Sequence, residues 1–223
     1  MGWKIFAVFA TVEPGYFSSH PAHDEERADT MLARLGLSGY QRDGESDFES
    51  AMYPRDGSLY IGAYPRGVII CEMKLPSHFF DDESRRRISG TATGFNNVKS
   101  NLLNLYPGGH VLAIVLHSVV NLWGYSYYSQ GNLLRSAAGA SDDGLFANYG
   151  TPLPEESRVL STCSIENVDE EGYGEELTFD VAERLFGWRI GERIGEFDDF
   201  GLRMSKYTKK GFLASLWSKL RRN

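Results

Sequence analysis

Three strand-like runs follow one another in the stretch HVLAIVLHSVVNLWGYSYYSQGNLLRSAAG, residues 110–139. They cover residues 110–119, 122–129 and 133–139. The Gln130-Gly131-Asn132 segment between the last two runs is typical of a tight hairpin turn. Because hairpins join antiparallel strands, this stretch predicts an antiparallel sheet, and it decides the fold class.

Upstream segments fit the same pattern. Residues 3–12 are rich in β-branched and aromatic side chains and end at Glu13-Pro14-Gly15, a turn signal. Residues 59–64 and 68–73 flank the turn Pro65-Arg66-Gly67 and predict a second hairpin.

Helices are predicted between these strands. Residues 24–35 carry apolar side chains at helical spacing and are followed by Gly36, a helix stop. Further helices are expected within residues 77–105 and over residues 179–186, and the acidic segment 166–176 is expected to be a solvated loop. The chain is therefore predicted to be α+β, with a largely antiparallel sheet built from hairpins and helices packed against it.

Charge is distributed unevenly along the chain. Residues 203–223 contain seven basic residues and no acidic residue. Residues 1–202 contain 16 basic and 30 acidic residues, so that this part carries −14 and the C-terminal part +7. We expect a single acidic α+β domain over residues 1–205 and a basic amphipathic tail over residues 206–223.

The tail is predicted to form a helix that begins near Lys210 or Gly211. Its apolar side chains fall within an arc of about 140° on a helical projection. About a dozen residues at ~1.5 Å each reach ~18 Å, which is too short to span a bilayer but enough to lie in its interface. The residues predicted to contact an anionic membrane or a protein partner are Lys209, Lys210, Phe212, Leu213, Leu216, Trp217, Lys219, Leu220, Arg221 and Arg222.

Three destinations of the tail stay open. It can dock on its own domain near the acidic segment 169–176, lie on an anionic membrane, or bind another macromolecule. Nucleic acid is disfavoured, because the −14 body repels phosphates.

The predicted location is the cytoplasm, with reversible attachment to the inner face of the membrane as an extension of that prediction. The N-terminal apolar run stops at Val12, and it is too short to span a bilayer and lacks the features of a signal peptide. Cys71 and Cys163 lie far apart in a cysteine-poor chain, and nothing requires a disulfide between them.

Several turn and core segments carry a family resemblance. They are Leu59-Tyr60-Ile61-Gly62-Ala63-Tyr64-Pro65, His117-Ser118-Val119-Val120, Gly131-Asn132-Leu133-Leu134-Arg135-Ser136, Asn148-Tyr149-Gly150-Thr151-Pro152-Leu153-Pro154-Glu155 and Phe186-Gly187. Through them, residues 1–205 resemble a family of uncharacterised bacterial domains. Family members often continue the Leu-Pro-Glu run with an aromatic residue, where this chain has Glu156-Ser157. The resemblance implies a fold and transfers no activity, cofactor or site.

Two histidine groups are candidates for chemistry. His20 and His23 form an H-x-x-H pair followed by three carboxylates, a combination that can hold a divalent ion. The ordinary interpretation is a solvated loop in front of a helix capped by Asp24, so no metal or other cofactor is predicted. His117 is the candidate catalytic base, although Ser118, its neighbour on a strand, is expected to point to the opposite face.

Two hypotheses about function follow. The first is a non-enzymatic binding protein whose basic tail holds it at an anionic membrane or against a protein partner. The alternative is a hydrolase-like enzyme that uses His117 together with groups that the fold brings near. No phosphate-binding loop, zinc-protease motif or nucleophile elbow occurs in the sequence, which favours the first hypothesis.

Overall fold

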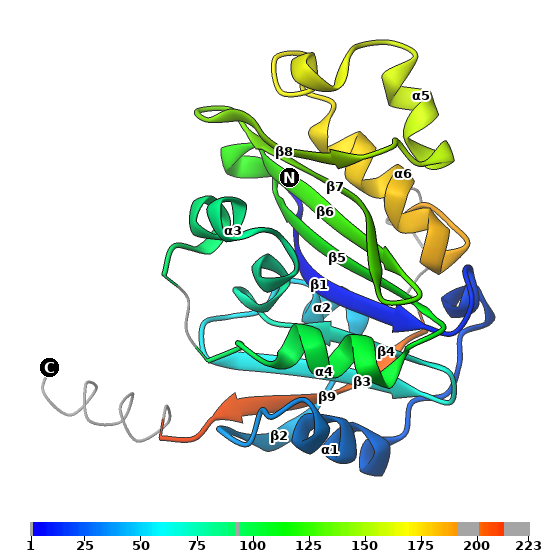
Figure 1. Cartoon of the computed structure of the whole chain (residues 1–223). Coiled ribbons are helices and arrows are strands. Elements are labelled where there is room, and N and C mark those ends of the chain that lie inside the picture. Colours follow the sequence, from blue (N-terminus) through cyan, green and yellow to red (C-terminus); the bar gives the residue numbers. More distant parts are fainter. Residues whose placement is uncertain (1, 92–93, 191–200, 212–223) are drawn as a thin grey trace, which may run out of the picture.

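A computed structural model describes residues 2–91, 94–190 and 201–211 (Figure 1). Its strands form one antiparallel sheet in the order β2-β9-β3-β4-β1-β5-β6-β7-β8. They are β1 (Lys4–Thr11), β2 (Tyr40–Asp47), β3 (Ser58–Tyr64), β4 (Gly67–Cys71), β5 (His110–His117), β6 (Leu122–Ser129), β7 (Asn132–Ala140), β8 (Gly144–Gly150) and β9 (Arg203–Lys209). The predicted α+β class with an antiparallel sheet is confirmed.

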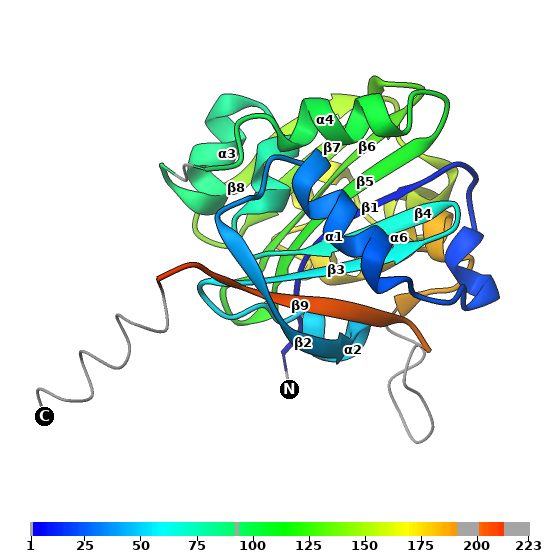
Figure 2. The same cartoon turned by 90° about the horizontal axis from the view of Figure 1, so that it is seen from below.

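Helices cover both faces of this sheet. The α-helices are α1 (Glu25–Arg34), α2 (Phe48–Ala51), α3 (Asp82–Ser89), α4 (Val98–Leu105), α5 (Ser157–Leu160) and α6 (Gly174–Phe186). The 3-10 helices are η1 (Tyr16–Ser19), η2 (Leu75–Phe79), η3 (Ser118–Val120), η4 (Pro154–Glu156) and η5 (Ile165–Asn167). Figure 2 shows α3 and α4 on one side of the sheet and α2 on the other.

Strand β1 is buried on both faces, which explains its nearly continuous apolar sequence. Ile5 and Phe9 pack in a cluster with α2 and α6, whereas Val8 packs in a second cluster with α1 and α4. The sheet thus separates two cores, and β1 contributes alternate side chains to each.

Most locally encoded elements form where the sequence predicts them, but α6 begins at Gly174, inside the segment 166–176 that is expected to be a solvated loop, and η5 also lies partly in that segment. The β6–β7 turn has positive φ at Gln130 (51°) and Gly131 (77°), as a two-residue hairpin turn requires. Helix α1 is capped by Asp24, whose carboxylate accepts the Arg27 backbone N–H at 2.9 Å. The expected helical region 77–105 is divided into η2, α3 and α4.

Three strands were not foreseen: β2, β8 and β9. Strand β9 lies between β2 and β3, so the domain boundary predicted between residues 205 and 206 falls inside a strand of the sheet. Tyr207 of β9 is fully buried and donates its hydroxyl hydrogen to Asp29 at 2.7 Å. The acidic domain therefore extends at least to Lys209.

The predicted tail helix lies outside the described residues, as do most of its predicted contact residues: Phe212, Leu213, Leu216, Trp217, Lys219, Leu220, Arg221 and Arg222. Lys209 ends β9, and its backbone N–H donates to Gly57 at 2.9 Å. The Lys210 ammonium group donates to the carbonyl of Ser38 at 2.8 Å. These two lysines thus belong structurally to the domain.

Candidate functional site

The connection between β5 and β6 forms a protruding ridge, which we define as residues His117 to Leu122. Its sequence turns through η3 and then through Asn121, which adopts a left-handed conformation with φ of 46°. Val119 and Val120 stand out of it with exposed fractions of 75% and 54%. Two adjacent aliphatic side chains therefore face solvent at this position.

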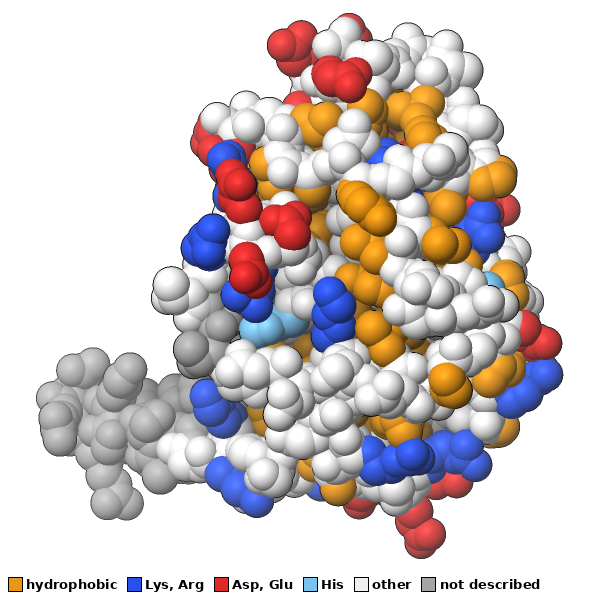
Figure 3. All heavy atoms as spheres, viewed as in Figure 1, with side chains coloured by type: hydrophobic (Ala, Val, Ile, Leu, Met, Phe, Trp, Pro, Cys, Tyr) orange, Lys and Arg blue, Asp and Glu red, His pale blue; other side chains and the backbone are white. Residues whose placement is uncertain are grey.

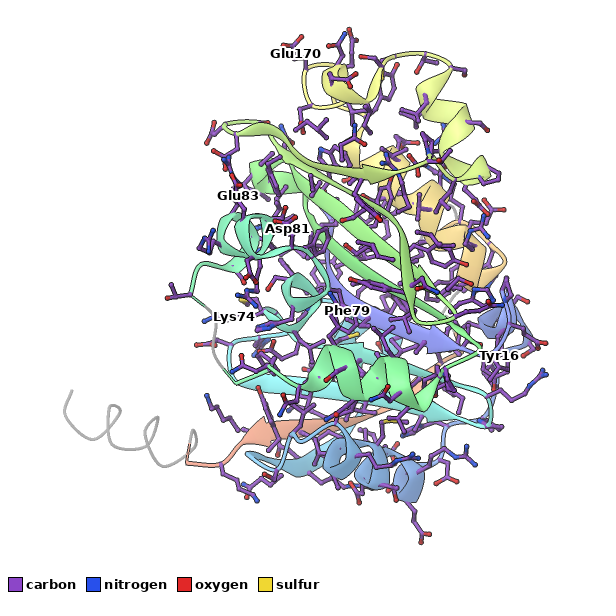
Figure 4. The ribbon with its side chains drawn as sticks, in the orientation of Figure 1. Tyr16, Lys74, Phe79, Asp81, Glu83 and Glu170 are labelled. Atoms are coloured by element: carbon purple, nitrogen blue, oxygen red, sulfur yellow. The ribbon has the colours of Figure 1, made fainter. Side chains whose placement is uncertain are left out.

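An acid-lined cavity of about 190 Å³ lies on one side of the ridge. The ridge contributes Ser118 and Asn121 to it, the first turn of α6 contributes Glu175 and Glu176, and the segment before α6 contributes Asp169. This segment belongs to the same loop region as Glu170, which Figure 4 labels. The cavity therefore presents carboxylates to any group that enters it.

Hydrogen bonds fix the groups that line the acidic cavity. Ser118 Oγ accepts the Trp3 backbone N–H at 3.0 Å and donates to the Glu175 carboxylate. Trp123 Nε1 donates to Asp169 Oδ1 at 2.5 Å. The second oxygen of Asp169 is buried and has no hydrogen-bond partner among the described residues, and burial raises the pKa of this carboxyl. Asp169 Oδ2 is thus a buried acceptor that a donor on a bound group would satisfy.

A larger cavity of about 510 Å³ lies on the other side of the ridge, where the loop after β7 approaches α3. Its lining includes His117 and Val120 from the ridge, Lys74 from the segment before η2, Arg87 from α3, and Asp142. Figure 4 labels Lys74 below α3, and Figure 3 shows charged side chains of both signs crowded over this region beside hydrophobic ones. The charges in this cavity are mixed.

His117 stands in the larger cavity, while Ser118 lines the acidic one, so the two side chains point apart as the strand geometry predicted. Burial and nearby Lys4 lower the pKa of His117. Within the described parts of the chain, its ring makes no hydrogen bond or ion pair, and its recorded ring neighbour is Phe6. Asp142 and Asp143 line the same cavity, but no hydrogen bond joins a carboxylate or a nucleophile of the described residues to His117.

The candidate metal ligands His20 and His23 have separate structural roles. The Nδ1 atom of His23 accepts the Ala63 N–H at 3.1 Å, and its Nε2 atom bonds the Ser205 hydroxyl at 3.0 Å. Both ring nitrogens of His23 are therefore engaged within the fold, Nδ1 as an acceptor and Nε2 as the donor to Ser205. His20 adopts a left-handed conformation with φ of 47°. No group of three or more potential metal ligands occurs among the described residues.

Sequence reasoning missed a buried charged network beneath β8. Arg135 and Glu156 are both fully buried, and Arg135 also donates to Asn148 Oδ1 at 2.6 Å. These residues come from or directly follow the segments that carry the family resemblance. The sequence signal that could have revealed this network is Arg135 itself, which lies in the middle of an apolar hairpin strand. A charged side chain buried at such a position requires a buried partner.

A family model described as a family of unknown function, DUF6928, matches residues 5–183. The chain belongs to this family. The match contains the ridge, the residues of the acidic cavity and the buried network of this DUF6928 domain, and it ends before β9. No curated protein and no solved structure was found to match the chain. No helix in the described portion of this DUF6928 domain is long and apolar enough to cross a membrane.

Proposed function

We propose that this protein is a non-catalytic binding protein that holds a polypeptide partner at the ridge. The observation that carries the proposal is the exposure of Val119 and Val120 between two cavities. Exposed aliphatic side chains gain hydrophobic stabilisation when a partner covers them. A cavity on each side offers a place for side chains that flank the partner's apolar contact.

The chemistry of the acidic cavity indicates a basic partner. Asp169 and Glu175 offer carboxylate oxygens, and the guanidinium of an arginine can bind such oxygens through several N–H groups at once. The net charge of −14 over residues 1–202 would also attract a basic polypeptide and raise its association rate. We therefore propose a partner segment in which apolar residues lie next to an arginine or lysine.

The hydrolase-like alternative has no comparable support. His117 lacks a hydrogen-bonded partner within the described residues, and Cys71 is fully buried with a pKa raised by burial. A thiol in such a setting is a poor nucleophile. Binding is therefore the function that the geometry favours.

Selection of peptides from a random displayed library tests this function. Wild-type protein should enrich sequences that combine apolar residues with arginine or lysine, and Val119→Asp should weaken binding of the enriched peptides at least tenfold, a loss of ~1.4 kcal/mol or more. Glu175→Gln should selectively weaken peptides that contain the basic residue. Val12→Asp is the matched control, because Val12 is an exposed valine that directly follows β1, at the opposite end of that strand from Lys4, which pairs with His117 of the ridge.

The proposal fails if no sequence class is enriched. It also fails if the selected peptides bind Val119→Asp as tightly as they bind the wild type. Either result would indicate that no partner covers the two valines, since exposed apolar side chains are common on protein surfaces.

We also propose that the protein is cytoplasmic and that its basic tail holds it reversibly at an anionic membrane. The support is the sequence, which places an apolar stripe among the basic residues of positions 209–222. Each basic residue near an anionic surface contributes about 1 kcal/mol. Residues 209 and 210 are already tied to the domain, so the remaining basic residues, Lys219, Arg221 and Arg222, would carry the attraction.

Docking of the tail on the acidic segment of its own chain is less compatible with the sheet order. That segment packs on β6 through the Trp123–Asp169 hydrogen bond, and β6 is five strand positions away from β9. At about 4.8 Å per position, the two strands are ~24 Å apart. A helix of ~18 Å that begins after Gly211 would not cover this distance.

Vesicle flotation tests the membrane proposal. The full chain should float with anionic vesicles and be released by salt, whereas a chain truncated after Gly211 should not float. This truncation keeps the whole of β9, so the domain remains intact. Equal flotation of both chains, or of neither, would contradict the proposal.

A further inference from the structure

In the described part of the chain the sheet ends in two edge strands, β2 and β8, and they differ sharply in charge. Edge strand β2 carries Arg42, Asp43, Glu45 and Asp47, and its register shifts between Arg42 and Glu45. The pairing of β8 with β7 has a register shift as well, so the difference between the two edges lies in their charge, and charged side chains prevent an edge from pairing with another strand. Edge strand β8, with the sequence GLFANYG, contains neither a charged residue nor a proline.

Among the described residues β8 pairs with β7 alone, although η5 lies close to part of the strand. In the described structure, the backbone of residues 145–150 forms its strand hydrogen bonds with β7 and makes no backbone hydrogen bond to any other segment. The carbonyls of Tyr149 and Gly150 additionally accept from Arg135. The Tyr149 side chain is 58% exposed. An uncharged edge with an exposed aromatic residue is a template for strand addition.

The buried network holds this edge in an extended conformation. Arg135 donates to Asn148 Oδ1 and to the Tyr149 carbonyl, which anchors the last part of β8 to the body of the sheet. Because the strand is already ordered, a partner strand would not have to order it on binding.

We infer that β8 is a pairing edge through which two copies of this chain form an antiparallel dimer with a continuous sheet. An antiparallel strand edge is its own complement under a two-fold axis, and the absence of charge in β8 avoids repulsion between identical strands. This inference goes beyond the proposed binding function and does not depend on the ridge.

One pairing register between β8 and β8 of the second copy fits the side chains without a clash. Ala147 and Tyr149 pair with Ala138 and Ser136 of β7 and lie on one face of the sheet. Pairing centred on Asn148 places Tyr149 opposite Ala147 of the second copy, on the same face. The small alanine leaves room for the aromatic ring, so the exposed fraction of Tyr149 would fall on dimerisation.

Sedimentation equilibrium of the full chain from micromolar to millimolar concentration tests this inference. We expect a monomer–dimer equilibrium that strengthens with salt, because screening weakens the repulsion between two chains of net charge −7. Tyr149→Lys should weaken dimerisation at least tenfold by placing a charge on the edge. Gln41→Lys, an exposed substitution on the opposite edge strand β2, is the matched control and should leave dimerisation unchanged.

Amide hydrogen exchange provides a second readout that needs no variant. Amides of residues 145–150 should exchange more slowly as protein concentration rises. The inference is overturned if the chain stays monomeric at every concentration, or if a dimer forms equally well with Tyr149→Lys. Protection of β8 amides only by added displayed peptides, with the chain monomeric, would overturn it and identify an extended peptide as the occupant.

Discussion

Arg135 and Glu156 form an ion pair in which neither side chain reaches solvent. Arg135 Nε and Nη2 donate to the two carboxylate oxygens at distances of 2.9 to 3.2 Å. Glu156 Oε1 also accepts the Leu153 backbone N–H at 2.8 Å. The pair joins a central position of β7 to the segment that follows β8, so it fixes the path of the chain at this edge of the sheet.

The pair predicts a large stability difference between two neighbouring glutamates. Glu156→Gln leaves the buried Arg135 charge uncompensated and should lower the free energy of unfolding by about 3 kcal/mol, measured by urea denaturation. Glu155→Gln, the control, loses a partly exposed pair with Arg184 and should cost less than about 1 kcal/mol.

Removing both charges of the buried pair tests the coupling. Arg135→Met combined with Glu156→Gln should be less destabilised than the sum of the two single variants. Simple additivity in this double-mutant cycle would contradict an interacting pair.

From the burial of His23 we expect the protein to lose stability in mild acid. Burial lowers its pKa below the ordinary value of 6.5, so the folded state favours the neutral ring. Its contribution is fully present above pH 6.5 and is lost as the pH falls through the lowered folded value. The urea midpoint should therefore drop as the pH falls below 6.5, and His23→Gln should show a smaller drop. An NMR titration that places the His23 pKa above 6.5 would contradict this.

We expect the substitution Asp169→Asn to have opposite effects on stability and on peptide binding. Burial raises the pKa of this carboxyl, so its ionised form opposes folding above the folded pKa and this penalty disappears as the pH falls. Asp169→Asn keeps an oxygen for Trp123 Nε1 and should raise the free energy of unfolding by less than about 1 kcal/mol, because the side chain is partly exposed. The same variant should weaken basic peptides selected on the wild type. A stabilised variant with unchanged peptide affinity would remove Asp169 from the proposed site.

Strand β9 predicts a sharp limit to C-terminal truncation. A chain ending at Gly211 should keep the thermal midpoint of the full chain. A chain ending at Leu202 lacks the strand between β2 and β3 and should fail to fold cooperatively, as judged by calorimetry. Tyr207→Ala within the full chain should cost about 3–5 kcal/mol, because it empties a fully buried aromatic site.

The two thiols should differ in accessibility. Cys71 is fully buried, whereas Cys163 is partly exposed, and neither forms a disulfide. A thiol reagent should label Cys163 in the native protein and reach Cys71 only after unfolding. Labelling of Cys71 at the same rate as Cys163 would contradict the packing of β4.

The ridge could be recognised only in part from the sequence. The apolar run was evident and was predicted to be a strand over residues 110–119, whereas β5 ends at His117 and residues 118–120 form η3. Strand alternation correctly separated His117 from Ser118. The acidic cavity could not be recognised from the sequence. Asp169 and Glu175 follow the ridge by about fifty residues and reach it only when α6 packs on β6.

The sequence by itself determined the elements whose physical cause is local. The two hairpins follow from turn residues such as Gln130-Gly131, and α1 follows from its cap and its apolar spacing. Tertiary structure alone decided β9 and the partner of Arg135. Strand β9 has few apolar residues and becomes a strand because β2 and β3, more than 140 residues earlier, supply its hydrogen bonds and bury Tyr207. Such non-local pairing depends on which segments meet in space, and no local pattern encodes it.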